Sequence, residues 1–287
     1  MKQLINDITA QLLAAYPEDE AHSLAWWIVE EETGLSRTQL QIGCKITKNF
    51  AHVQEIIDRL LHFEPIQYIF GHTLWCGLDL KLTPATLIPR PETAELVEQI
   101  SNFKFQISNC RVLDLGTGSG CIAIALKKRH PEWQVTGIDI SADAIEIAKE
   151  NARRNGVEVN FQVADIFDSI DKIFNFQILN LKSPISNLKY DVVVSNPPYI
   201  RESEKSSMRP NVLNYEPASA LFVSDNDPLL FYRRIAELHV GKYLFFEINE
   251  AFPAELSAML NELGYTDIQI SNDIYSKPRI ISARYFL

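Results

Sequence analysis

The chain has 287 residues, of which 37 are acidic and 27 basic, giving a formal net charge of −10 at pH 7 and a pI of about 5.1. This length allows one large domain or two modest ones with packed cores. The acidic balance argues against a protein that binds nucleic acid through clustered Lys and Arg. The four Cys form no C-x-x-C pair, so we expect free thiols, a reducing compartment and no metal site.

No apolar run reaches the roughly 18 residues that a membrane span needs. The N-terminal residues show neither the apolar region of a signal peptide nor the Arg-rich character of a transit peptide. We therefore expect a cytoplasmic protein of bacterial type with no membrane partner.

Residues 1–71 are predicted to form a helical bundle, because apolar residues recur there at helical spacing without strand-like alternation. Gly34 is expected to end one helix, since glycine readily adopts the left-handed conformation of a helix C-terminus. Ser36 and Gln39 have the spacing of a capping box for the next helix. A further amphipathic helix is expected to stop before Pro65.

Residues 72–91 are predicted to form a β-hairpin linker between two domains. Leu78, Leu80 and Leu82 alternate as in a strand, and Gly77 offers a turn. The prolines that follow stiffen the connection into the third segment, residues 92–287.

In residues 92–287, strands and helices alternate in the βαβ manner that implies a parallel sheet with right-handed crossovers. The last two predicted strands have only a loop between them, which suggests an antiparallel hairpin at the sheet edge. Residues 168–189 are expected to form an insertion before the fourth strand. The predicted strands are 111–115, 133–138, 159–163, 190–195, 242–248, 266–271 and 279–286.

A glycine-rich loop follows the first of these strands. Gly116, Gly118 and Gly120 allow the backbone to approach a ligand closely, and the following helix offers unpaired N–H groups. Asp139 ends the next strand, where a ribose-binding acid belongs. A nucleotide diphosphate and S-adenosylmethionine both fit this outline. The G-x-G-x-G spacing and the preceding acid, Asp114, which would repel a pyrophosphate, favour S-adenosylmethionine.

Asn196, Pro197, Pro198 and Tyr199 directly follow an apolar strand. Two prolines cannot continue a central strand, so the tetrapeptide stands at the carboxyl end, where open α/β sheets bind ligands. The Asn196 side-chain oxygen and the Pro197 carbonyl can accept the two hydrogens of a planar NH2 group, while Tyr199 packs on its face. Taken alone, the motif also fits a simple strand-ending turn.

Together, these motifs resemble those of class I S-adenosylmethionine-dependent methyltransferases that modify an exocyclic or amide nitrogen. Three further segments, PIQYIFG (65–71), IPRPET (88–93) and YEPASALF (215–222), are similar to those of the peptide chain release factor glutamine N5-methyltransferases of the HemK type. The similarity runs from about residue 60 to the C-terminus, with the motifs in the family's order. The resemblance implies an α/β fold, a Rossmann-like seven-stranded methyltransferase domain preceded by a small helical domain.

The resemblance also implies roles for individual residues. Asn196, Pro197 and Tyr199 would be catalytic, and the four residues Asn196–Tyr199 would bind the substrate amide. Asp165 would contact the adenine amino group, although a helix N-cap is an equal reading of its position. The residues implied to bind S-adenosylmethionine, with S-adenosylhomocysteine as product, are Gly116, Thr117, Gly118, Ser119, Gly120, Asp139, Asp165, Ile166 and Asn196.

The predicted reaction is methylation of the glutamine in the Gly-Gly-Gln motif of class 1 release factors, with the helical domain docking that protein and the enzyme acting as a monomer. One alternative is methylation of an adenine or guanine amino group in DNA or RNA; another is a cofactor-binding partner without catalysis. The chain departs from the family pattern at Ala94, at 223–227 and at Asn249. These departures affect expected loop geometry and leave Asn196 and the glycine loop intact.

Overall fold

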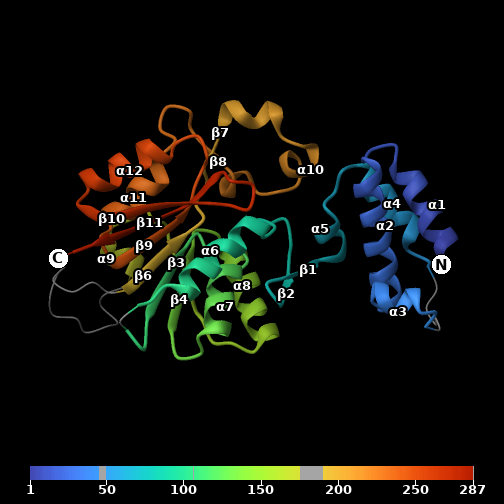
Figure 1. Ribbon diagram of the computed structural model, residues 1–287, viewed down its shortest axis with the longest axis horizontal. Coiled ribbons are helices and arrows are strands. Elements are labelled where there is room, and N and C mark those ends of the chain that lie inside the picture. The colour runs from blue at the N-terminus through green and yellow to red at the C-terminus, as the bar shows by residue number, and fades with distance from the viewer. Residues whose placement is uncertain (45–49, 106, 175–189, 287) are drawn as a thin grey trace. The chain divides into compact units, whose positions relative to one another are not determined.

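The computed structural model describes residues 1–44, 50–105, 107–174 and 190–286 (Figure 1). Two compact units form within it. The first comprises Met1–Gly71 together with Arg209–Tyr215, and the second comprises His72–Met208 and Glu216–Leu287. Each unit has its own hydrophobic core.

The first unit is helical, with a core of aliphatic residues such as Ile8, Ile28 and Ile57. Gly34, at φ 68°, caps the second helix, as its sequence position predicts. The predicted capping box is also present, because Ser36 and Gln39 exchange side-chain-to-backbone hydrogen bonds. The helices are α1 (Lys2–Leu12), α2 (Glu18–Thr33), α3 (Arg37–Gln41), α4 (Val53–Leu61) and α5 (Ile66–Phe70).

The segment 209–215 belongs to this helical unit, although the sequence predicts it to be part of the C-terminal domain. It contains the short helix α10 (Pro210–Leu213). Arg209 pairs with Glu20 through Nη1, 3.0 Å from each carboxylate oxygen. The Tyr215 hydroxyl donates to the carbonyl of His62 at 2.9 Å. The chain therefore leaves the second unit for seven residues and then returns to it.

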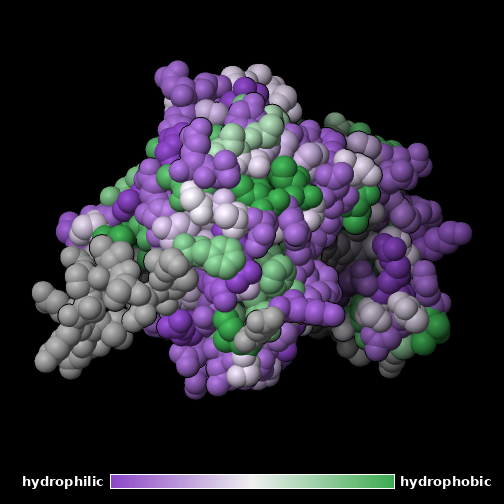
Figure 2. Space-filling model, turned by 60° about the vertical axis from the view of Figure 1, so that its left-hand side comes forward, coloured by the Kyte–Doolittle hydropathy of each residue, from purple (hydrophilic) through white to green (hydrophobic). Residues whose placement is uncertain are grey.

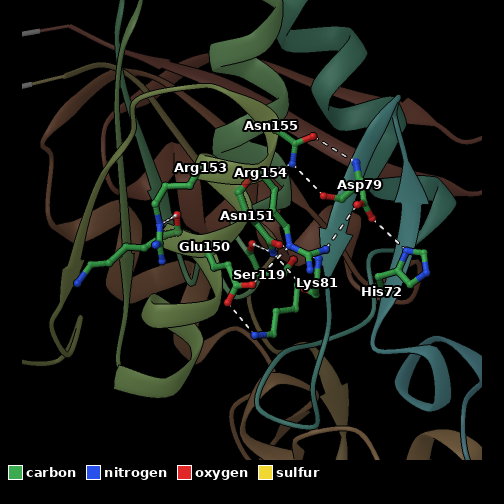
Figure 3. Close-up of polar contacts among 10 residues, drawn as sticks. His72, Asp79, Lys81, Ser119, Glu150, Asn151, Arg153, Arg154 and Asn155 are labelled. Carbon is green, nitrogen blue, oxygen red and sulfur yellow. Dashed lines mark hydrogen bonds and ion pairs between the residues drawn. The ribbon is translucent and has the colours of Figure 1, made fainter.

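The second unit begins with the hairpin of β1 (His72–Trp75) and β2 (Leu78–Lys81), which pair antiparallel around Gly77. Figure 3 shows how polar side chains of α8 (Ala142–Asn155) hold this hairpin. Asn151 is fully buried; its Oδ1 accepts from the Lys81 amide at 2.7 Å, and its Nδ2 donates to the carbonyls of Lys81 and Ser119. One side chain thus joins the hairpin to the glycine loop.

A seven-stranded sheet forms the centre of the second unit, in the order β10-β11-β9-β6-β3-β4-β5. All neighbouring strands are parallel except β11, which runs antiparallel to β9 and β10. This architecture confirms the predicted fold class, and each strand end lies within one residue of its prediction. The strands are β3 (Arg111–Leu115), β4 (Gln134–Asp139), β5 (Asn160–Val163), β6 (Tyr190–Ser195), β9 (Gly241–Glu247), β10 (Tyr265–Asn272) and β11 (Pro278–Tyr285).

Alternate residues of the central strands fill two cores, one on each face of the sheet. Val112 and Phe245 pack with one set of helices, whereas Leu113 and Phe246 pack with the other. This alternation follows from the two-residue period of side chains along a strand. The helices on the first face are α6 (Pro91–Asn102), α7 (Cys121–Arg129) and α8; on the second they include α11 (Leu230–Glu237) and α12 (Pro253–Glu262).

The remaining elements are short. The predicted insertion, 168–189, begins with α9 (Ile170–Phe174), and its residues 175–189 lie outside the described part of the chain. After the Asn-Pro-Pro-Tyr motif come β7 (Ile200–Arg201), η2 (Glu202–Ser207), η3 (Ala218–Ala220) and β8 (Phe222–Val223). Strands β7 and β8 pair in parallel, bringing the two ends of the 202–221 excursion together.

On the face drawn in Figure 2, hydrophilic residues dominate and hydrophobic ones form interrupted patches. Within the described residues, none of the helices combines the length and apolar character needed to cross a membrane.

Candidate active site

The glycine loop joins β3 to α7 and is fastened to the end of β4. The amides of Gly116 and Thr117 both donate to the Ile138 carbonyl, at 2.8 and 2.9 Å. Gly116 and Gly118 have positive φ, and a Cβ added to either would meet no atom within 4 Å. The loop backbone therefore faces open space at these two positions, which suits close approach of a ligand.

Gly120 serves packing rather than ligand approach. A Cβ there would lie 3.0–3.1 Å from Ile124, Ala148 and Phe161, and the residue has φ +80° at the N-cap of α7. Any larger residue would push α7 away from its neighbours. Glycine is thus needed in this loop for two different reasons. Gly116 and Gly118 leave the backbone open, whereas Gly120 allows tight packing.

Asp139 lies at the end of β4 and contacts the loop directly. Its Oδ2 accepts from the Gly118 amide at 2.8 Å, and its Oδ1 accepts from the Ser141 amide at 2.9 Å. Burial raises the pKa of Asp139, while these backbone donors oppose that shift. The carboxylate is held at the carboxyl edge of the sheet beside the glycine loop, where the sequence analysis expected it.

Asp114 is fully buried beneath the same loop. Its Oδ2 accepts from the Thr117 hydroxyl at 2.6 Å, whereas its Oδ1 makes no hydrogen bond within the described residues. Burial raises the pKa of Asp114 to about 7, against the opposing effects of Thr117 and the Ala123 amide. A buried carboxylate oxygen without a donor is suited to a ligand that brings a positive charge or N–H groups.

Asp165 and Ile166 follow β5. The Asp165 carboxylate accepts from the Phe167 amide at 2.8 Å, and the Ile166 carbonyl accepts from Arg234 at 2.7 Å. Asp165 therefore stabilises a local turn through one oxygen, and the assignment of an adenine contact to it stays a prediction.

The Asn-Pro-Pro-Tyr motif lies at the end of β6, next to the end of β3. The Ser195 hydroxyl donates to the Leu115 carbonyl at 2.6 Å, joining the two strand ends. Asn196 donates through Nδ2 to the Thr93 hydroxyl at 3.3 Å. The Tyr199 hydroxyl donates to Glu247 at 3.1 Å, and burial raises the pKa of Tyr199. The motif and the glycine loop thus occupy the same carboxyl edge of the sheet.

Glu247 is a site residue whose contacts the sequence did not reveal. It ends β9, is almost completely buried, and accepts from the Thr93 hydroxyl at 2.7 Å as well as from Tyr199. Burial raises the pKa of Glu247, and the opposing influences are Thr93, Tyr199 and the charge of Arg279. In the sequence, Glu247 stands out as an acid at the end of an apolar run, in a strand that resembles one of the family's.

Glu216, for which the sequence left both a substrate-facing and a structural role open, has a structural set of contacts. Its carboxylate accepts from the Ile88 amide at 3.1 Å and from Arg90 at 2.6 Å. The Arg90 carbonyl in turn accepts from the Trp75 indole at 2.9 Å. These bonds fix the segment that leads into α6, and therefore the position of Thr93 in the first turn of that helix.

A surface hollow of about 490 Å³ lies elsewhere in the second unit. It is lined by Phe105, His130 and Trp133 among others, at the amino ends of β3 and β4. Ligands of open α/β sheets bind at the carboxyl ends of the strands. The edge that carries the glycine loop and Asn196 is therefore the candidate active site.

Comparisons with known proteins bear on the family and the fold. A methyltransferase-domain family model matches residues 106–225, and the PrmC N-terminal domain model matches residues 3–71. The catalytic domain of hMettl16, solved in complex with MAT2A 3'UTR hairpin 6, is 16% identical and superposes with a TM-score of 0.53 over 74% of this chain and 77% of that chain. That likeness shows a shared fold.

Sequence relatives are more specific. The chain is 40% identical to the release factor glutamine methyltransferase of Bacteroides thetaiotaomicron over 99% of each protein. It is 37% identical to the protein of the same name from Flavobacterium psychrophilum, over 96% of this chain and 95% of the relative. Since this similarity extends over both proteins almost from end to end, the chain belongs to the family of release factor glutamine methyltransferases.

Proposed function

We propose that this chain transfers a methyl group from S-adenosylmethionine to the N5 side-chain amide of the glutamine in the Gly-Gly-Gln motif of class 1 peptide chain release factors. Its membership of the family supports the reaction. The observation on this chain that carries the proposal is the setting of Asn196. Its amide nitrogen is bonded to Thr93, which leaves its carbonyl oxygen to accept a hydrogen bond from a substrate NH2 group.

The site would act by positioning a weak nucleophile. The nitrogen of a glutamine amide is unreactive because its lone pair is delocalised into the carbonyl. Hydrogen bonds from its two hydrogens to Asn196 Oδ1 and to the Pro197 carbonyl would fix the nitrogen and favour positive charge on it. Positioning of this kind lowers a barrier by up to ~7–11 kcal/mol for ideal alignment. Pro198 and Tyr199 would complete the amide-binding surface, with the ring of Tyr199 against the flat group.

No side chain needs to act as a general base in this scheme, since a methylated amide cation is acidic enough to lose its proton to water. When bound, S-adenosylmethionine supplies the activated methyl group. The open backbone at Gly116 and Gly118 fits its methionyl part, and the buried Oδ1 of Asp114, which has no hydrogen-bond donor among the described residues, lies beneath the same loop. Thr117, Ser119, Gly120, Asp139, Asp165, Ile166 and Asn196 are the other residues proposed to hold it.

The helical unit is proposed to dock the release factor. The enzyme is proposed to act as a monomer in the cytoplasm, where translation takes place. Two observations argue for a protein substrate rather than a nucleic acid: the formal net charge of −10 and the names of the relatives.

The first experiment incubates the purified chain with radiolabelled S-adenosylmethionine and a class 1 release factor, beside the same factor with Gln→Ala in its Gly-Gly-Gln motif. Label on the intact factor alone supports the reaction, the target residue and the partner together. Label on DNA or rRNA, with none on the factor, would overturn the proposal in favour of the amino-group alternative.

A variant tests the role of Asn196. Asn196→Ala is expected to lower kcat by at least about 100-fold, because the substrate amide loses its acceptor and its alignment. S-adenosylhomocysteine binding, measured by calorimetry, should change by less than about 10-fold. Normal turnover in this variant would contradict the mechanism.

A further inference from the structure

One buried carboxylate holds both functional side chains of the Asn-Pro-Pro-Tyr motif. Glu247 Oε1 accepts from the Tyr199 hydroxyl at 3.1 Å, and Glu247 Oε2 accepts from the Thr93 hydroxyl at 2.7 Å. The Thr93 oxygen in turn accepts from Asn196 Nδ2 at 3.3 Å. Three elements far apart in the chain, α6, β9 and the end of β6, therefore meet in one hydrogen-bond network.

The chemistry of these groups fixes the direction of each bond. Both carboxylate oxygens of Glu247 accept, one from the Tyr199 hydroxyl and one from the Thr93 hydroxyl, and a hydroxyl has a single proton to donate. Once Thr93 donates that proton to Glu247, its oxygen can only accept from Asn196. The Asn196 amide must then present its NH2 side to Thr93 and its carbonyl oxygen away from it.

We propose that Glu247 and Thr93 are positioning residues that set the orientation of the Asn196 amide, so that its oxygen rather than its NH2 group meets the substrate. This inference rests on the proposed function for its substrate, a primary amide. A reversed Asn196 would set its own N–H donors against those of the substrate. Two donors facing each other in a partly buried site leave both unsatisfied, which is costly.

Burial raises the pKa of Glu247, and the contacts around the carboxylate oppose that shift and hold it in place. Its main-chain carbonyl accepts from the Tyr232 hydroxyl at 3.1 Å, which fixes the end of β9. The charge of Arg279 favours its ionised form, and Arg279 is itself held by Asp273, with Nε 3.1 Å from Oδ2. The Asn249 amide donates to the Tyr199 carbonyl at 3.0 Å and fixes the last residue of the motif.

Isosteric substitutions test the relay, by which we mean the hydrogen bonds that run from Glu247 through Thr93 to Asn196. Thr93→Val keeps the shape of the side chain but removes the hydroxyl, and Glu247→Gln lets a carboxamide donate to Thr93 and reverse the bond direction. Each is expected to lower kcat by about 10–100-fold, with the KM for the release factor and the affinity for S-adenosylhomocysteine within about 2-fold of wild type. Thr93→Ser, which restores the hydroxyl, should recover most of kcat.

A double variant and a matched control separate positioning from general loss of stability. Thr93→Val/Glu247→Gln should be no slower than Thr93→Val alone, since both changes break the same chain of bonds. Thr86→Val removes another buried hydroxyl, which donates to the Thr83 carbonyl at 3.3 Å, and should leave kcat unchanged. Additive losses, or equal losses in Thr86→Val and Thr93→Val, would refute the relay.

A spectroscopic readout keeps this test independent of the substrate. The side-chain NH2 resonances of Asn196 in the ¹⁵N-labelled protein, identified by their absence in Asn196→Ala, should shift in Thr93→Val and Glu247→Gln but not in Thr93→Ser. Unmoved resonances would overturn the inference even if the wild type labels the release factor. Shifted resonances with no labelling would uphold the relay and reject the proposed function.

Discussion

At the scale of single residues, Asp114 couples the stability of the fold to pH. Its carboxyl is fully buried, and burial raises its pKa from 3.8 to about 7. Below pH 3.8 both the folded and the unfolded chain hold this proton. Between pH 3.8 and about 7 the unfolded chain releases the proton while the folded one keeps it, so stability falls as pH rises. Burial raises the pKa of Asp139 and Glu247 in the same direction.

Asp114 is therefore expected to lower the stability of the cofactor-free protein as the pH rises from about 4 to about 7, measured as the free energy of unfolding from urea titrations. Asp114→Asn should weaken this dependence and stabilise the protein at pH 8 by about 1–3 kcal/mol, because it removes a buried charge that lacks one partner. An unchanged slope in this variant would show that Asp114 titrates at its ordinary pKa in the folded chain.

At the scale of elements, Asn151 joins the β1–β2 hairpin to the sheet domain. Its side chain bonds the Lys81 amide and the carbonyls of Lys81 and Ser119 (Figure 3). Asn151→Ala is expected to destabilise the protein by about 2–4 kcal/mol, since buried main-chain groups lose their partners. The midpoint of urea unfolding measures this loss, and S-adenosylhomocysteine affinity should fall with it because Ser119 belongs to the glycine loop.

Asn155 provides the matched control on the same helix. It bonds the amide and carbonyl of Asp79 at 3.2 and 2.9 Å, but at a more exposed position. Asn155→Ala should cost about 1 kcal/mol, because water replaces its bonds. Equal losses of stability in the two variants would mean that the burial of Asn151 does not account for its contribution to stability.

The elements also show which features can be read from sequence. Strand ends and the hairpin were predicted because they depend on local signals: alternating apolar residues, Gly77 and the paired prolines. The glycine loop and Asn196 were placed at one edge because parallel strands share their carboxyl ends. The bond between Thr93 and Glu247 joins residues 154 positions apart. No periodicity encodes such a contact, so the sequence identified the motif residue Asn196 but not the carboxylate behind it.

At the scale of the whole molecule, the helical unit is built from two stretches of chain. Residues 209–215 pack with residues 1–71 through the Arg209–Glu20 pair and the Tyr215–His62 bond. The sequence did not predict that residues 209–215 belong to the helical unit, because a stretch of seven residues shows no periodicity that indicates which domain it packs against.

Deletion of residues 1–71 tests the role of this unit. The shortened protein is expected to bind S-adenosylhomocysteine within about 3-fold of the full chain, because the glycine loop and Asp139 lie in the second unit. Methylation of the release factor should fall by at least about 100-fold if the helical unit supplies docking. Retained methylation would place docking on the second unit alone.

The same deletion removes the packing partner of residues 209–215, so chymotrypsin should cleave after Tyr215 in the shortened protein much faster than in the full chain. Equal cleavage rates would indicate that the segment is held by other contacts.

The return of the chain into the helical unit has a consequence for exchanging parts between relatives. The PrmC N-terminal domain model ends at residue 71, which invites a chimera joined at that point. Such a hybrid would combine the helical bundle of a relative with residues 209–215 of this chain. Arg209 would then lack its partner unless the relative also carries an acid at the position of Glu20. A chimera that exchanges residues 1–71 and 209–215 together keeps the contacts within the helical unit intact. The helical unit is discontinuous in sequence, so substitutions at contacting positions of its two segments, 1–71 and 209–215, are expected to co-vary among relatives.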